Sequence, residues 1–243
     1  MRDFLQALSF LTILPLGKNR LPEEKTLGRS MAFFPLAGLV IGLLAAFGYY
    51  LLSFLFPKPI VLWFTVALLA IMTGGLHLDG LADTLDGLGA GGTKEKMLEV
   101  MRDSRTGAFG VMGLIFLIGS KYLALEQIPG PFLPYSFILM TVMGRNSMVL
   151  VSYRSPYARA GIGLARPFLE NLGSREVILS SASALVIAIL YPGLKGLTAF
   201  LGVGIFSLIY RFYFMGRLSG VTGDILGAAN ELSEVLCLLL LIV

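Results

Sequence analysis

Three aspartates recur at a regular interval in one short stretch of the chain. Asp79, Asp83 and Asp86 stand at positions i, i+4 and i+7, so a helix would carry them on one face, within about 60° of each other. Like charges at this spacing repel one another and destabilise a helix unless a cation neutralises them. Carboxylate oxygens favour magnesium, calcium or manganese over zinc. The stretch therefore predicts a divalent cation site, with a solvated helix end as the alternative interpretation.

The only histidine of the chain, His77, comes two residues before the first of these aspartates. A histidine here could orient an aspartate, contact a substrate or act as a general base. A histidine that packs between helices is an equally good interpretation. With this alternative open, the candidate catalytic residues are Asp83, Asp86 and His77, and the candidate metal ligands are Asp79, Asp83, Asp86 and Asp103.

A second polar stretch begins at Arg102 and leads into a long apolar segment. The planar guanidinium groups of Arg102 and Arg105 suit phosphate oxygens. Ser104 and Gly107 stand where the first amides of a helix would add donors for an anion, so these four are candidate substrate- or phosphate-binding residues. Asp103 is expected either as a further metal ligand or as the partner of Arg102. An ordinary boundary between a loop and an apolar segment is an equal alternative.

A third polar group lies near the C-terminal end. Asp224, Glu231 and Glu234 stand at i, i+7 and i+10, on one side of a helix. A helix that faces lipid would not carry them, so they require water, a cation or arginines from other helices. Arg145 lies inside an apolar segment and also requires a carboxylate or phosphate partner. We take Arg145, Asp224 and Glu231 as candidate substrate-binding residues, with a structural ion pair to Arg145 or Arg211 as the alternative.

The first and third groups are expected to meet. Asp224 is expected at the start of its helix, at the same depth in the membrane as the end of the helix that carries the aspartates at 79–86. We therefore expect one water-accessible cavity to serve both acidic groups. Glu231 and Glu234 are expected one to two turns deeper, at about 1.5 Å per residue. There they would orient arginines such as Arg145.

The elements that position these residues are predicted to be membrane helices. Hydrophobic residues make up 56% of the 243 residues and charged residues only 14%, against about 25% charged in soluble domains. The composition predicts a single all-α membrane domain over residues 1–243, a polytopic transmembrane helical bundle of six to seven spans. With roughly 20 apolar residues needed per span, the spans are expected at about 33–56, 60–77, 107–128, 132–152, 176–192, 195–214 and 225–243. The last span is the weakest, because charged groups occupy its first half.

The N-terminal run Leu5–Leu16 is only faintly similar to a signal peptide, because Asp3 offsets the charge of Arg2 and Pro15 ends the run. We interpret it as mature sequence that forms a short interfacial or re-entrant helix. With Cys237 as its only cysteine, the chain has no disulfide of its own. One cysteine and one histidine also exclude a zinc site built from several such ligands.

Basic residues divide unevenly between the connecting segments. Of the 19 Lys and Arg residues, 15 lie before Phe33, from His77 to Arg105, from Tyr153 to Arg175 or from Arg211 to Arg217. Cytoplasmic loops carry an excess of Lys and Arg, so the N-terminus and these loops are expected in the cytoplasm. Seven spans would then place the C-terminus outside, and six would place it inside.

Six stretches resemble the cobalamin synthase family, also called adenosylcobinamide-GDP ribazoletransferases, in the same order along essentially the whole chain. They are Leu8–Thr12 with Pro15, Phe34–Gly38, Gly74–Gly87, Met97–Gly110, Tyr157–Arg159 and Thr222–Glu231. The block from Gly74 to Gly110 is highly specific. The resemblance implies a multi-span, magnesium-dependent enzyme of the bacterial inner membrane. The polar motifs imply an active site at the cytoplasmic face.

The implied reaction joins adenosylcobinamide-GDP to α-ribazole or its 5′-phosphate, and yields adenosylcobalamin or its 5′-phosphate together with GMP. Mg²⁺ held by Asp79, Asp83 and Asp86 would bridge the diphosphate, and Arg102 and Arg105 would neutralise further charge. Asp83 or Asp86 would take the proton of the attacking hydroxyl. The expected partners are these small molecules and membrane lipid, without nucleic acid, and a homo-oligomer is left open.

Two other functions are weighed against this one. The stretch from Asp83 to Ala90 is similar to the start of the CDP-alcohol phosphotransferase signature, but Gly91 stands where that signature has arginine. An ion transporter would also carry acids in its spans. A transporter predicts acids near the membrane midplane, whereas these acids cluster toward the cytoplasmic ends.

Overall fold

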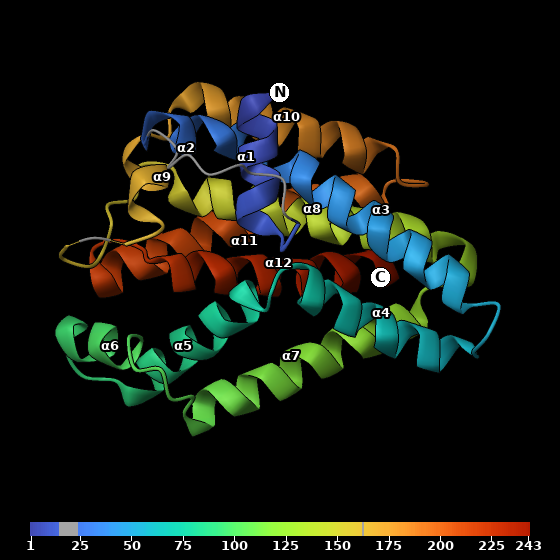
Figure 1. Ribbon diagram of the computed structural model, residues 1–243, viewed down its shortest axis with the longest axis horizontal. Coiled ribbons are helices and arrows are strands. Elements are labelled where there is room, and N and C mark those ends of the chain that lie inside the picture. The colour runs from blue at the N-terminus through green and yellow to red at the C-terminus, as the bar shows by residue number, and fades with distance from the viewer. Residues whose placement is uncertain (15–23, 162) are drawn as a thin grey trace.

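The computed structural model describes residues 1–14, 24–161 and 163–243, and within these ranges the regular elements are helices. Their bounds are α1 Arg2–Leu11, α2 Glu24–Ser30, η1 Met31–Phe33, α3 Phe34–Leu52, α4 Lys58–Met72, α5 Leu76–Ala90, α6 Lys94–Val100, α7 Ala108–Gln127, η2 Gly130–Phe132, α8 Leu133–Ser152, α9 Arg166–Glu170, α10 Ser174–Ile189, α11 Lys195–Leu218 and α12 Gly223–Ile242. Figure 1 shows them as one helical bundle. The predicted all-α class is confirmed.

Helix α8 is the centre of the bundle. It packs against α3, α10, α11 and α12, and it is buried along almost its whole length. Small residues allow the close approach of α3: a Cβ on Gly38 would lie 2.5 Å from the Thr141 carbonyl oxygen. The Thr141 hydroxyl in turn donates to the Gly38 carbonyl at 2.8 Å. A polar residue such as Arg145 on this helix is therefore surrounded by protein rather than lipid.

Helices occupy all seven positions predicted as spans, but they differ in length and polarity. Among the described residues, four helical stretches are long and apolar enough to cross a membrane: Thr26–Leu52, Ala108–Gln127, Lys195–Leu218 and Gly223–Ile242. The bent pair α4 and α5 makes a fifth if it is one span. Helix α10 has only 16 residues, and α8 carries Arg145 and Asn146, which its central position shields. The chain thus combines lipid-spanning helices with helices held inside the bundle.

The predicted span 60–77 is wrong at its end. Helix α4 stops at Met72, and the chain bends by 87° before α5. Gly74 and Gly75 adopt φ values of +61° and +70° at the bend, in the left-handed region that glycine tolerates best. His77 therefore belongs to the first turn of α5, the helix that carries the three aspartates.

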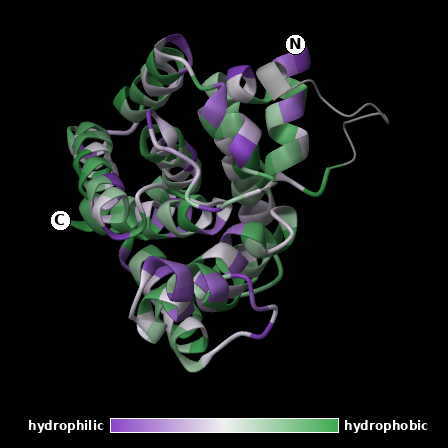
Figure 2. Ribbon diagram, turned by 90° about the vertical axis from the view of Figure 1, so that its left-hand side faces the viewer, coloured by the Kyte–Doolittle hydropathy of each residue, from purple (hydrophilic) through white to green (hydrophobic). Residues whose placement is uncertain are grey.

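The connecting segments separate into two groups, as the distribution of basic residues predicts. Figure 1 shows α6 and α9 toward one end of the bundle, and the α3–α4 connection and the C-terminus toward the other. Figure 2 looks at the end with α6 and α9, where hydrophilic residues mark segments near the viewer beside largely hydrophobic helices.

The N-terminal run is a helix, α1, as predicted, although Pro15 and Leu16 lie outside the described residues. Its Ala7, Leu8 and Leu11 are buried against the rest of the bundle.

Candidate functional site

Helices α5 and α12 run antiparallel in close contact, and two glycines permit that contact. A Cβ on Gly80 would lie 2.8 Å from the backbone oxygen of Asp224, and a Cβ on Gly227 would lie 3.2 Å from the Cα of His77. Any larger residue would push the helices apart. The contact brings the start of α12 beside the aspartates of α5.

Asp83 lies among other carboxylates. It is half-buried and makes no hydrogen bond or ion pair with another described residue. Asp79, Asp224 and Asp86 act on it electrostatically as like charges, and Arg159 acts as an opposing positive charge. The first and third acidic groups therefore converge, as predicted from the sequence.

Asp86 has a different environment from the other two aspartates of α5. It is buried, and its carboxylate accepts hydrogen bonds from the backbone amides of Gly107 at 2.6 Å and Gly110 at 2.8 Å. These amides begin α7, so Asp86 satisfies donors that a helix N-terminus leaves unpaired. The amides that were expected to bind a substrate anion, including that of Gly107, bind this carboxylate instead.

The loop before α7 pairs its own charges. Asp103 accepts from the guanidinium of Arg105 at 2.7 Å, and these hydrogen bonds lower the pKa of Asp103 to about 2. Arg105, rather than Arg102, is its partner, so the predicted pairing with Arg102 is wrong. Ser104 is exposed. Arg102 is the member of this loop that reaches the cavity described next.

A cavity of about 270 Å³ lies where the acidic groups meet. Its polar side is formed by His77, Asp79, Arg102, Tyr157, Arg159 and Asp224. His77 is buried, and neither of its ring nitrogens has a hydrogen-bond partner in the part of the chain that the structure describes. Because Asp79 and Asp224 both line this space, the predicted shared cavity is confirmed. We call it the aspartate cavity.

Arg159 has no role in the sequence-based prediction, yet it connects three segments around the aspartate cavity. Its Nη2 donates to Asp224 Oδ2 at 2.6 Å and to the Met101 carbonyl oxygen at 3.0 Å. Its buried Nε has no hydrogen-bond partner within residues 1–14, 24–161 and 163–243. The partners lie 65 and 58 residues away along the chain, so no local spacing indicates the contact.

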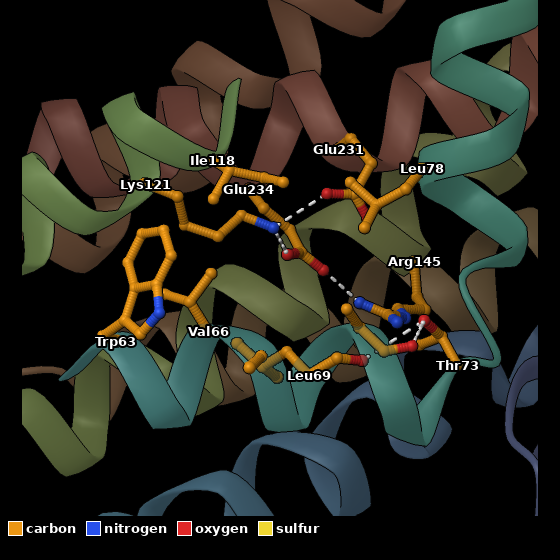
Figure 3. A pocket seen from close by; sticks show the side chains of 12 residues that line it. Trp63, Val66, Leu69, Thr73, Leu78, Ile118, Lys121, Arg145, Glu231 and Glu234 are labelled. Carbon is orange, nitrogen blue, oxygen red and sulfur yellow. Dashed lines mark hydrogen bonds and ion pairs between the residues drawn. The ribbon is translucent and has the colours of Figure 1, made fainter. Parts of the chain in front are cut away.

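A second polar cluster lies deeper in the bundle (Figure 3). Lys121 donates to Glu231 at 2.8 Å and to Glu234 at 2.7 Å, and Arg145 pairs with Glu234. All four side chains are almost fully buried, and their formal charges cancel. The predicted orientation of Arg145 by an acid of α12 is confirmed. Arg211, the other partner considered, donates to Ser155 Oγ and to the Arg154 carbonyl oxygen.

This buried cluster is separate from the aspartate cavity. Arg145 and Glu231, both predicted to bind substrate, line another cavity of about 180 Å³ with Lys121, Glu234 and Trp63. Lys121 of α7 is buried at 4% exposure. Figure 3 shows Lys121 reaching toward both glutamates.

Within the described ranges, no group of three or more His, Cys, Asp or Glu side chains is close enough together to hold a metal ion on its own. Asp86 is engaged with α7, and Asp103 with Arg105. The carboxylates that remain unpaired beside the aspartate cavity are Asp79 and Asp83.

Comparison with known proteins covers the whole chain. A family model described as cobalamin-5-phosphate synthase matches residues 3–242. A protein of Geotalea daltonii named adenosylcobinamide-GDP ribazoletransferase is 40% identical over 100% of this chain and 97% of its own length. Proteins with the same name from Syntrophobacter fumaroxidans and Escherichia coli are 41% and 36% identical, over 97% and 98% of this chain and 96% and 98% of their own lengths. No solved structure matches the chain significantly.

Proposed function

The chain belongs to the cobalamin-5-phosphate synthase family and acts as an adenosylcobinamide-GDP ribazoletransferase, and we propose that the aspartate cavity is its active site. The observation that carries this assignment is the convergence of Asp79 and Asp224 with Arg102 and Arg159 around one cavity. The acceptor is α-ribazole or its 5′-phosphate, and the products are adenosylcobalamin or its 5′-phosphate and GMP.

In this transfer a ribose hydroxyl of the acceptor attacks the phosphorus that stays on cobinamide. A new oxygen–phosphorus bond forms, and the bond from that phosphorus to the oxygen of GMP breaks. Positioning and charge stabilisation supply most of the catalysis of such reactions. The chain must therefore hold the diphosphate, neutralise its oxygens and accept one proton.

The residues around the aspartate cavity supply these functions. Arg102 and Arg159 line the cavity and would bind the phosphate oxygens, which suit guanidinium donors. Asp83, which has no partner of its own among the described residues, takes the proton of the hydroxyl. Asp224 holds Arg159 in place. Asp86 fixes the start of α7 and thereby the loop that carries Arg102.

The donor chemistry of the cavity fits Mg²⁺. Asp79 lines the cavity and Asp83 lies close to its acids; both offer oxygens, and the like charges around Asp83 leave negative charge that a cation would balance. Mg²⁺ typically keeps several waters and binds one or two carboxylates together with substrate phosphates, so a preformed three-carboxylate cage is not needed. We propose that Asp79 and Asp83 would hold the ion, and that it would supply charge stabilisation to the diphosphate.

A direct assay tests the activity. Purified protein is given adenosylcobinamide-GDP and α-ribazole, with and without Mg²⁺, and GMP release is followed. We expect turnover with Mg²⁺ and little after chelation. If a CDP-activated alcohol with diacylglycerol or inositol is the better substrate pair, the assignment is wrong and the CDP-alcohol phosphotransferase interpretation replaces it.

We also propose that the protein lies in the inner membrane with the aspartate cavity toward the cytoplasm, because the basic loops gather at that end. Cysteines that replace Gly89 or Gly92, or that are placed in the loop after Tyr153, are expected to resist an impermeant thiol reagent in intact cells. The background is Cys237→Ser, and a cysteine in the α3–α4 turn at Ser53 is the control that should be labelled. Rapid labelling at position 89 would mean that the protein has the opposite orientation in the membrane.

A further inference from the structure

The aspartate cavity has two halves of different chemistry. One half carries the acids and arginines of the proposed active site. The other half is apolar and includes Phe10 of α1, Met31 of η1, Phe34 of α3, Met148 of α8, Phe168 of α9 and Leu226 of α12. A cavity that is charged on one side and apolar on the other fits a ligand with the same division.

Three aromatic rings form the centre of the apolar half. The ring centroids of Phe10 and Phe168 are 4.4 Å apart, and Phe34 lies 6.3 Å from Phe10 and 6.0 Å from Phe168. Phe34 and Phe168 are almost fully buried, whereas Phe10 is half-buried. Phe10 is therefore the ring with surface left to contact a ligand, and aromatic pairs favour offset or edge contacts at such distances.

We propose that the apolar half is the subsite for the base of the incoming nucleoside, and that it selects an apolar benzimidazole over a purine. This inference rests on the proposed function. In α-ribazole an aromatic benzimidazole is joined to a ribose, so the base fits the phenylalanines while the ribose hydroxyl faces the acids. The volume of about 270 Å³ is near the lower end of ligand pockets, at roughly 300–1,000 Å³, and suits one part of a substrate rather than a corrin.

The preference for benzimidazole over a purine follows from the lack of polar side chains in the apolar half of the cavity. The apolar side chains of this half offer no strong hydrogen-bond donor or acceptor. A purine would lose the water bound to its extra ring nitrogens and exocyclic group without replacement, which is costly. The same reasoning disfavours the guanine of the other substrate. A benzimidazole loses much less.

The first test compares two acceptors on the unaltered protein. With adenosylcobinamide-GDP held constant, kcat/KM for α-ribazole is expected to exceed that for the matching adenine α-riboside by on the order of 10- to 100-fold. Equal values would overturn the base subsite and leave the proposed function intact. If neither nucleoside gives GMP, the proposed function fails. Equilibrium dialysis of each free nucleoside would then test the subsite alone, and equal binding would overturn it.

The second test uses variants of the subsite. Phe10→Ala is expected to raise KM for α-ribazole by about 10-fold while KM for adenosylcobinamide-GDP stays unchanged. Met148→Gln adds an amide to the apolar wall. It is therefore expected to reduce the ratio of kcat/KM for α-ribazole to kcat/KM for the adenine α-riboside. Phe212→Ala, which removes an exposed ring of α11, is the matched control and should change neither KM. A rise in KM for adenosylcobinamide-GDP alone would assign the apolar half to that substrate and overturn the proposal.

Discussion

Asp83→Asn is expected to lower turnover by at least about 100-fold, the range of a lost general base, while the protein stays folded. Asparagine has the same shape as aspartate but cannot accept the proton of the hydroxyl or carry the negative charge offered to a cation. Asp83 has no structural partner among the described residues, so its replacement costs the fold little. GMP release and the thermal unfolding midpoint, measured on the same preparation, separate the two effects.

Asp103→Asn provides the control for this experiment. Asp103 is also a candidate metal ligand by its sequence, but it pairs with Arg105 in an exposed loop and does not line the aspartate cavity. We expect near-normal turnover. If Asp103→Asn inactivates the enzyme and Asp83→Asn does not, the active site lies at the loop and the cavity assignment is wrong.

Several features of the site were predictable because they depend on spacing or on the cost of buried charge. The intervals between Asp79, Asp83 and Asp86 place them on one helix whatever the tertiary fold. Asp224 and Glu234 could not face lipid, and this cost alone indicated that each would find polar partners inside the bundle. The structure pairs Glu234 with Arg145 and brings Asp224 to the aspartate cavity.

Other features depend on contacts between distant segments, which spacing does not encode. The sequence does not distinguish Asp86 from Asp79 and Asp83. Its hydrogen bonds to the amides of Gly107 and Gly110 arise from the packing of α5 against α7. Arg159 reaches Asp224 across 65 residues. The bend at Gly74 and Gly75 was missed because an apolar run with glycines is compatible with either a continuous helix or a break.

The largest effect on stability is expected from Glu234→Gln. This acid pairs with both Lys121 and Arg145 inside the bundle, so its neutralisation leaves two buried cations facing the single charge of Glu231. Removing one partner of a buried ion pair costs about 3–5 kcal/mol, which would lower the unfolding midpoint by about 10 °C. The residual folded enzyme should keep its KM values, because the cluster does not line the aspartate cavity.

A charge-balanced double variant shows whether charge, rather than packing, causes this loss. Lys121→Met alone should also destabilise, because it leaves Glu231 and Glu234 with only Arg145. Combined with Glu234→Gln it leaves one cation and one anion, so the double variant should lose clearly less than the sum of the two single losses. Additive losses would mean that the four charges act independently. In that case the buried cluster would not be the unit that holds α7, α8 and α12 together.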